Sequence, residues 1–341
     1  MPRIGLLYDE RFLDHRPPHE HPEHPGRLRA IWRRLEAAGL PERCVRVPAR
    51  LATRAELCAV HEARVVDELL ATAGTPIHWI DGDTYACAES AATASLAAGG
   101  LTDLCRAVVR GELQGGLALI RPPGHHAERG RAMGFCLFNN VAVAAQAMLD
   151  SGDCKRVIVL DWDLHHGNGT QDIFWADGRV LYVSTHQHPL YPGTGLSDEV
   201  GEGPGEGRTL NVPLPGGLGD ADYLDVFDRL LMPACRAFDA DLVIVSAGFD
   251  ASAGDPLGAM RVTPSGFAQM TQRLCGLAQG KVVMALEGGY NLDAISASTE
   301  ACLRVLLGEA PDAVELELLS PISKRVVDRA LERHKAYWPD L

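Results

Sequence analysis

Three ionisable residues at alternate positions, Asp161, Asp163 and His165, offer metal-ligating chemistry in one short segment. In an extended chain, side chains at i, i+2 and i+4 point to the same side, with neighbours roughly 6.6 Å apart at Cα. Two of them can therefore reach one cation, and Asp250 can supply a third ligand from a distant segment. Three protein ligands and one open position are typical of a catalytic zinc site, although this donor set also suits Fe²⁺, Co²⁺ or Mn²⁺. Taken alone, the triplet could instead be a cap or a Mg²⁺ or phosphate site.

Two adjacent histidines, His125 and His126, follow Pro-Pro-Gly and are expected in a rigid turn. Metal-activated water needs a base and a leaving amine needs an acid, and histidine can do both near neutral pH. Each ring also needs a partner for its second nitrogen, and Asp161 and Asn168 are available. One charged and one neutral partner would move the two imidazole pKa values apart, which would give the two rings different roles.

A tyrosine and two loop aromatics could complete such a site. Tyr290 follows Glu-Gly-Gly, and its phenol could hydrogen-bond a developing oxyanion. Gly134, Phe135 and Tyr191 lie on two loops near the same sheet edge. Two facing rings would form a narrow apolar slot for a straight alkyl stem, and packing in the core is the alternative.

Four further histidines lie among prolines near the N-terminus: His15, His19, His21 and His24. They could suggest a second metal site. The surrounding segment is polar, so we expect a solvated surface loop instead.

The elements that position these residues form an alternating pattern. Apolar runs typical of buried parallel strands are Ile4–Tyr8, Leu117–Ile120, Val157–Leu160, Val180–Ser184, Leu242–Ser246 and Val282–Leu286. The last five runs lead at once into blocks of ionisable, polar or glycine-rich residues. The carboxyl ends of parallel strands share one edge of the sheet, so these residues should meet in the crevice where open α/β sheets bind ligands.

Helical patterns separate the strands and predict one α/β domain with an open, mainly parallel sheet flanked by helices. They are Pro25–Ala38, Thr53–Ala63, Ala88–Val109, Asn140–Leu149, Tyr223–Phe238, Thr263–Leu277 and Leu292–Leu307. We expect the catalytic domain to span residues 1–310. Residues 311–341 are expected to hold one more helix, docked on the domain or placed at a subunit contact.

The composition of the chain excludes several classes of protein. Of the 341 residues, 46% are hydrophobic and 23% charged, as in soluble globular proteins. We find neither a bilayer-spanning apolar run nor a signal peptide. The net charge of −13 argues against direct nucleic-acid binding. Nine cysteines, an odd number without a CxxC, argue against a disulfide framework and a thiolate zinc site, and favour a reducing, cytoplasmic compartment.

Several sequence blocks together resemble the signature of zinc-dependent histone deacetylases. They are Arg121–Glu128 (RPPGHHAE), Gly134–Asn139 (GFCLFN), Asp161–Gln171 (DWDLHHGNGTQ), Ser246–Asp250 (SAGFD) and Glu287–Asn291 (EGGYN). The resemblance runs in order from Ile4 to about Gly308. Asn168, where class I members usually carry Asp, and Asp81–Tyr85 make the chain similar to class II enzymes and their bacterial relatives.

This resemblance implies an arginase-like fold and a role for each site residue. Zn²⁺ would be bound by Asp163, His165 and Asp250. His126 would be the main general base and then acid, with His125 a mainly electrostatic partner. Tyr290 would polarise the substrate carbonyl.

The resemblance also implies further subsites. Phe135 and Tyr191 would line an acyl-lysine tunnel, and Gly134 would accept a backbone-level contact from the substrate amide. Arg27 would line an acetate-release channel. A structural K⁺ is implied at a set of five residues: Asp161, Asp163, His165, Ser184 and Thr185.

One departure bears on the substrate. Polyamine-specific relatives carry a glutamate in the Asp-Pro-x-Gly turn, where this chain has Leu257. We therefore expect hydrolysis of the amide of Nε-acetyl-lysine, or a related short acyl-lysine, in proteins or peptides, with release of acetate. The alternatives are an acylpolyamine or other small-molecule amidohydrolase and a non-catalytic acyl-lysine binding module. A homo-oligomer is left open.

Overall fold

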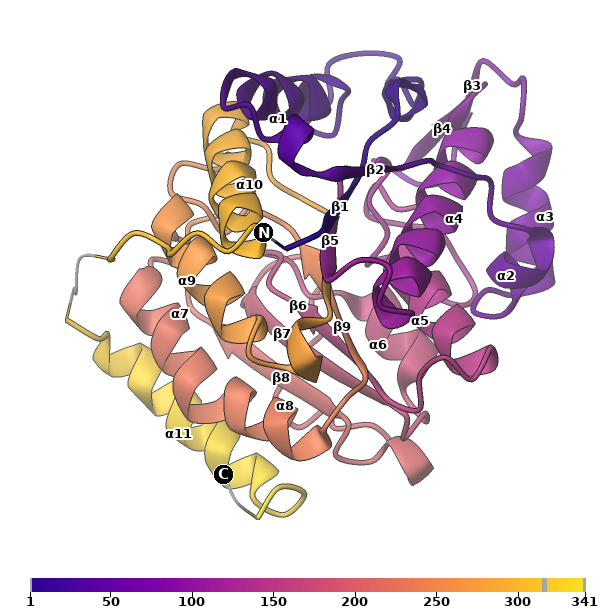
Figure 1. The fold of residues 1–341 in the computed structure, drawn as a ribbon. Coiled ribbons are helices and arrows are strands. Elements are labelled where there is room, and N and C mark those ends of the chain that lie inside the picture. Colours follow the sequence, from indigo (N-terminus) through magenta and orange to yellow (C-terminus); the bar gives the residue numbers. More distant parts are fainter. Residues whose placement is uncertain (1, 315–317, 340–341) are drawn as a thin grey trace.

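A parallel β-sheet forms the centre of the molecule (Figure 1). The computed structural model describes residues 2–314 and 318–339. Within them, eight strands pair in the order β2-β1-β5-β10-β9-β6-β7-β8, each parallel to its neighbours. Their bounds are β1 Ile4–Leu7, β2 Val45–Val47, β5 Gly115–Ala118, β6 Val157–Asp161, β7 Val180–Gln187, β8 Thr209–Leu214, β9 Leu242–Ala247 and β10 Val282–Leu286.

Helices cover both faces of this sheet because its central strands are apolar on both sides. They are α1 Gly26–Ala37, α2 Arg54–Cys58, α3 Ala63–Ala71, α4 Ser90–Val109, α5 Asn140–Asp150, α6 Asn168–Phe174, α7 Asp220–Val226, α8 Met232–Phe238, α9 Pro264–Leu274, α10 Leu292–Leu306 and α11 Pro321–His334. In Figure 1, α4 and α5 lie together on one side, and α1, α10 and α9 on the other. The predicted α/β class with a mainly parallel sheet is confirmed.

Several predicted elements are wrong in detail. Of the helix expected over Thr53–Ala63, only the short α2 forms: a capping box of Thr53 and Glu56 starts it, and it ends at Cys58. Helix α3 begins at Ala63 and was not predicted. The strand expected at Leu117–Ile120 pairs over Gly115–Ala118 instead. The glycines at the start of this strand pair with both neighbouring strands. They lack the apolar side chains on which the prediction relied.

Besides α3, the two edge strands and the short helix α6 also escaped prediction. The edge strand β2 is exposed, and β8 contains Asn211 and Pro213, so neither forms a clear apolar run. The short helix α6 begins at Asn168, inside the polar block after β6. A separate antiparallel hairpin pairs β3 (Ile77–Trp79) with β4 (Tyr85–Cys87).

The expectation of a solvated N-terminal histidine loop is wrong for His15. His15 is buried, its Nδ1 lies 2.6 Å from Ser90 Oγ, and its ring stacks on Tyr85. His19, by contrast, is exposed. The hairpin and the start of α4 cover His15, which sequence spacing could not indicate.

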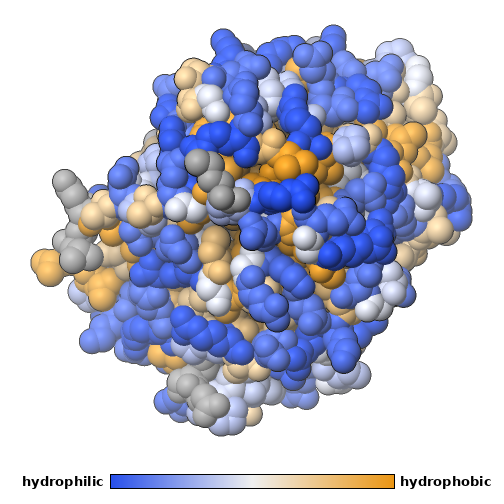
Figure 2. Space-filling model, in the orientation of Figure 1, coloured by the Kyte–Doolittle hydropathy of each residue, from blue (hydrophilic) through white to orange (hydrophobic). Residues whose placement is uncertain are grey.

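Helix α11 packs against β8 and α7 (Figure 1). Val327, Ala330 and Trp338 bury their side chains there, and Trp338 Nε1 donates to Gly207 O at 3.2 Å. Figure 2 shows a mostly hydrophilic face with a group of hydrophobic residues near its middle. Among the described residues, no helix combines the length and apolar character needed to cross a bilayer.

Truncating the tail anchor should destabilise the protein. Trp338 is only 5% exposed, so Trp338→Ala should lower the free energy of unfolding by roughly 3–5 kcal/mol. Denaturant unfolding measures this loss. Leu318, which is 98% exposed, supplies the control, because Leu318→Ala should change stability by no more than about 0.5 kcal/mol. Equal stability of the two variants would contradict the packing of the tail.

Candidate active site

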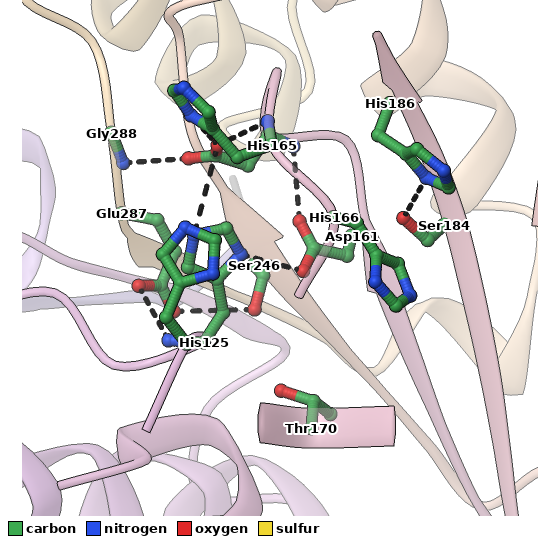
Figure 3. A network of polar contacts seen from close by, with 12 residues as sticks. His125, Asp161, His165, His166, Thr170, Ser184, His186, Ser246, Glu287 and Gly288 are labelled. Atoms are coloured by element: carbon green, nitrogen blue, oxygen red, sulfur yellow. Dashed lines mark hydrogen bonds and ion pairs between the residues drawn. The ribbon is translucent and has the colours of Figure 1, made fainter. Parts of the chain in front are cut away.

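The carboxyl ends of the central strands bring together side chains that are far apart in sequence. Asp161, the last residue of β6, is in register with Ser184 on β7 and with Ser246 on β9. The chain then bends through Asp163 and His165, so these two side chains lie directly beyond the sheet edge. Figure 3 shows this crowding of polar groups from several strands at one edge.

Asp163, His165 and Asp250 form a cluster suited to a metal ion. Their ligand atoms all lie within 4.8 Å of one another. His165 Nδ1 is 3.2 Å from Asp163 Oδ1 and 3.2 Å from Asp250 Oδ2. Both carboxylates are buried, whereas the His165 side chain is 12% exposed. Buried carboxylates need a compensating charge, and oxygen and imidazole donors are normal ligands for zinc. These residues therefore fit a divalent cation.

Backbone groups hold the two carboxylates in place. Gly288 N–H donates to Asp163 Oδ2 at 2.8 Å, and Leu164 N–H donates to Asp250 Oδ1 at 2.8 Å. A Cβ at Gly288 would collide with Asp250, and one at Gly248 would collide with Asp163. Glycine is needed at both positions because the backbone passes so close to the ligands.

The pKa values in this cluster reflect two close, buried negative charges. Burial, together with the nearby charge of Asp163, raises the pKa of Asp250 to about 7. Burial opposes protonation of His165, but its hydrogen bonds to both carboxylates outweigh burial and raise its pKa to about 10. The two carboxylates thus favour a positive charge beside them, as expected at a site for a cation.

His125 and His126 lie side by side, with ring centroids 4.0 Å apart, but they have different partners. His125 Nδ1 lies 2.9 Å from Asp161 Oδ2, and His126 Nδ1 lies 2.8 Å from Asn168 Oδ1. Burial disfavours the charged form of both rings. In His125 the charges of Asp163 and Asp161 outweigh burial and raise the pKa well above its usual value. In His126 burial, helped by the charge of His125, lowers the pKa well below it.

Glu287 is a buried carboxylate that sequence reasoning treated only as a neighbour of Tyr290. Its Oε2 accepts from Gly124 N–H at 2.6 Å and from His125 N–H at 3.2 Å. Its Oε1 accepts from Ser246 Oγ at 3.3 Å. Glu287 therefore fixes the histidine turn to β9 and β10, as Figure 3 shows. A carboxylate directly after a fully apolar strand was the signal that could have revealed it.

A pocket of about 270 Å³ leads from the surface to this cluster. Phe135 and Tyr191 are among its walls, together with Gly134 and Leu257. Tyr191 is 40% exposed and meets the His126 ring edge-on at 5.1 Å. Asp83, on the loop between β3 and β4, also lines the pocket and was missed by the site prediction. The pocket has apolar side walls and an imidazole-rich base.

Tyr290 is held at the wall of this pocket by residues on both sides. Asp255 Oδ2 accepts from Tyr290 N–H at 2.7 Å and from Asn291 N–H at 3.1 Å. The guanidinium of Arg27 lies 4.9 Å from the Tyr290 ring centre, and Arg27 Nε donates to Gly289 O at 2.7 Å. Asp255 was not predicted as a site residue, although it lies two residues before Leu257.

Arg27 belongs to a buried ion cluster. Arg27 Nη1 donates to Glu23 Oε1 at 3.1 Å, and Arg121 Nη2 donates to Glu23 Oε2 at 2.7 Å. All three side chains are fully buried. Two guanidinium groups around one carboxylate leave a net positive charge beside Tyr290. Glu23 was not predicted, because its role depends on partners far away in sequence.

The residues expected to bind potassium lie beside the metal-ligating segment. Ser184 and Thr185 are buried on β7, next to Asp161 on β6. Ser184 Oγ is 2.9 Å from His186 Nδ1 (Figure 3), and the buried Thr185 hydroxyl has no hydrogen-bond partner among the described residues.

Comparison with known proteins gives consistent matches. The family model described as "Histone deacetylase domain" matches residues 21–306. Histone deacetylase 15 of Arabidopsis thaliana is 47% identical over 98% of this chain and 62% of its own length. Histone deacetylase clr3 of Schizosaccharomyces pombe is 43% identical over 98% of this chain and 52% of its own length. Histone deacetylase 7 of Homo sapiens is 40% identical over 98% of this chain and 39% of its own length.

The fold agrees with a solved relative. The crystal structure of the HDA15 HD domain superposes with a TM-score of 0.95 at 46% identity, covering 99% of this chain and 96% of that one. The chain spans between two fifths and three fifths of the length of the curated relatives named above. The family model covers most of the chain, and the relatives match nearly all of it. The chain therefore belongs to the histone deacetylase family, as its motifs suggested.

Proposed function

We propose that this chain is a zinc-dependent lysine deacetylase, which hydrolyses the amide of Nε-acetyl-lysine in a protein or peptide and releases acetate. One observation carries the proposal. A cluster of two carboxylates and an imidazole lies at a pocket with apolar walls, beside one histidine paired with a carboxylate and one paired with an amide. Family membership supports the same activity. The alternatives, a small-molecule amidohydrolase and a binding module, have less support.

Asp163, His165 and Asp250 would hold one zinc ion. When bound, the ion would act as a Lewis acid on the amide carbonyl and would lower the pKa of a water molecule towards 7. A potassium ion beside Asp161, Ser184 and Thr185 is part of the proposal, supported by the unpartnered Thr185 hydroxyl.

The remaining site residues divide the proton chemistry among them. Overall, water adds a hydroxyl to the acyl carbon and a proton to the lysine nitrogen, as the amide C–N bond breaks. We assign the proton transfer to His126, because its neutral ring can accept a proton from water and return it to the leaving amine. His125, held charged by Asp161, would stabilise the negative charge that develops. The Tyr290 hydroxyl would donate to the carbonyl oxygen.

The shape and charge of the pocket favour an acyl-lysine substrate. The rings of Phe135 and Tyr191, which both line the pocket, suit a straight apolar stem. Gly134 leaves room there, since a Cβ would lie 2.6 Å from the His126 ring. Leu257 at the wall offers no counter-charge to a cationic polyamine. Arg27, close to Tyr290, would line the route by which acetate leaves.

Other parts of the proposal concern the whole protein. The family model ends at residue 306, which supports a catalytic domain of residues 1–310 and a tail of residues 311–341. The nine unpaired cysteines support a reducing, cytoplasmic compartment. The proposed partners are acetylated proteins or peptides. We propose no direct binding to nucleic acid or to membranes, and formation of a homo-oligomer is left open.

A fluorogenic acyl-lysine assay tests the activity. We expect turnover of an acetyl-lysine peptide that stops with a chelator and returns with added zinc. A panel of acyl groups would then define the preferred chain length. Binding of the peptide without turnover would instead support the binding module.

Replacing one ligand should abolish tight zinc binding. Changes of outer-shell partners alone typically cost 10–100-fold in metal affinity, so Asp250→Asn should weaken zinc binding by at least about 100-fold. Competition titration with a chromogenic chelator measures the affinity. Asp239→Asn, at an exposed carboxylate, is the control. Unchanged affinity in Asp250→Asn would rule out this zinc site.

Removing the phenol hydroxyl should slow the chemical step. Tyr290→Phe should lower kcat by about 10²–10³, the effect of losing one oxyanion donor, with little change in KM. Steady-state kinetics on the acetyl-lysine peptide measure both constants. Tyr337→Phe, which alters a phenol paired with Glu206 on the surface, should behave like the unmodified chain. A fully active Tyr290→Phe variant would contradict the assigned role.

An added charge at residue 257 should change the substrate preference. Leu257→Glu should shift the ratio of kcat/KM values roughly 10-fold towards acetylputrescine over acetyl-lysine peptide, by the gain of one charge-assisted hydrogen bond. The same kinetics with Leu196→Glu, at an exposed leucine that does not line the pocket, provide the control. If the unmodified chain already prefers acetylputrescine, Asp83 supplies the counter-charge and the substrate assignment is wrong.

A further inference from the structure

The amide of Asn168 contacts a different kind of partner at each end. Its Oδ1 lies 2.8 Å from His126 Nδ1. Its Nδ2 donates to Glu128 Oε1 at 2.6 Å and to Met133 Sδ at 3.4 Å. Both groups beside Nδ2 are hydrogen-bond acceptors, so a flipped amide would place Oδ1 against a carboxylate oxygen and would lose both bonds. Glu128 thus determines which end of the amide faces His126.

The orientation of this amide decides where His126 carries its proton. An amide oxygen can only accept, so it selects the tautomer of His126 with hydrogen on Nδ1. Nε2 is then unprotonated, as a general base requires. A flipped amide would present N–H groups to Nδ1 and select the tautomer with hydrogen on Nε2. A carboxylate at residue 168 would not have this ambiguity, because both of its oxygens accept.

Glu128 is itself held in a defined position. Arg131 Nε donates to Glu128 Oε2 at 2.7 Å, and Arg131 Nη2 donates to Oε1 at 3.1 Å. Its backbone is fixed as well, since Glu128 N–H donates to Arg131 O at 2.9 Å and His61 Nδ1 lies 2.9 Å from Glu128 O. The side chain is 23% exposed, so the carboxylate lies between the solvent-facing Arg131 and the buried amide.

We infer that Glu128 is a positioning residue, which fixes the reactive tautomer of His126 by orienting the Asn168 amide. The inference rests on the proposed role of His126 as general base. It assigns Glu128 no contact with substrate. Its effect should therefore fall on kcat, with KM nearly unchanged.

A charge-reversal cycle tests the inference. In Glu128→Lys, an ammonium donor would attract Oδ1 of Asn168 and flip the amide, so kcat should fall roughly 10–100-fold, as for outer-shell partners in general. In Asn168→Asp, the carboxylates at positions 128 and 168 would repel, and kcat should also fall. In the double variant the ammonium and the carboxylate attract, and a carboxylate accepts from Nδ1 in either orientation. Glu128→Lys should therefore raise kcat when Asn168→Asp is present.

Matched measurements separate this effect from damage to the fold. Glu68→Lys, at an exposed glutamate on α3, reverses the same charge nearby and should leave kcat unchanged. Thermal unfolding of each variant reports stability. Long-range ¹H–¹⁵N correlation spectra of the metal-free protein at about pH 8 report the His126 tautomer without any need for activity. We expect a proton on Nδ1 in the unmodified chain and on Nε2 in Glu128→Lys.

The outcomes distinguish failure of the inference about Glu128 from failure of the proposed deacetylase function. The inference is supported if Glu128→Lys lowers kcat in the unmodified chain but raises it when Asn168→Asp is present, and if the His126 tautomer changes as expected. A similar loss in both backgrounds, or an unchanged His126 tautomer in Glu128→Lys, overturns it. If the unmodified chain does not hydrolyse acetyl-lysine, the proposed function fails, while the spectra still decide whether Glu128 sets the tautomer.

Discussion

Two carboxylates, Asp163 and Asp250, are buried within a few ångströms of each other, and this is costly unless a cation lies between them. Much of the surrounding structure follows from that constraint. The order of the strands places β6 and β9 side by side, so that the segments after them can meet. Glycines at 248 and 288 let the backbone pass close to the carboxylates, and Gly288 N–H donates to Asp163. His165, the one partly exposed member, links this buried charge to the pocket.

The second constraint is that two neighbouring imidazoles must have different pKa values. His125 lies against the charged Asp161 and His126 against the neutral amide of Asn168, and the pKa values move in opposite directions. A neutral partner suits the role of base that we propose for His126, but an amide has two unlike ends. Glu128 resolves this by accepting from the other end. The charge pattern thus extends from the cluster of Asp163, His165 and Asp250, through the histidine pair, to the surface at Arg131.

Much of the fold and the central site could be predicted because their signals are local. Continuous apolar runs such as Val157–Leu160 and Val282–Leu286 indicate buried strands, and the polar residues after them must share one sheet edge. Signals that depend on distant partners were missed. Glu287 fixes the histidine turn, Glu23 pairs two arginines, and Asp255 holds Tyr290, yet each looks ordinary beside its sequence neighbours. The prediction that His15 lies on a solvated loop was wrong for the same reason, because the hairpin that buries it lies about 70 residues away.

X-ray absorption at the zinc edge of the purified, zinc-loaded protein tests the central claim most directly. The account predicts one zinc per chain with only oxygen and nitrogen neighbours at about 2.0–2.2 Å, including a single imidazole. A sulfur neighbour near 2.3 Å, two or more imidazoles, or no bound zinc in the folded protein would contradict it.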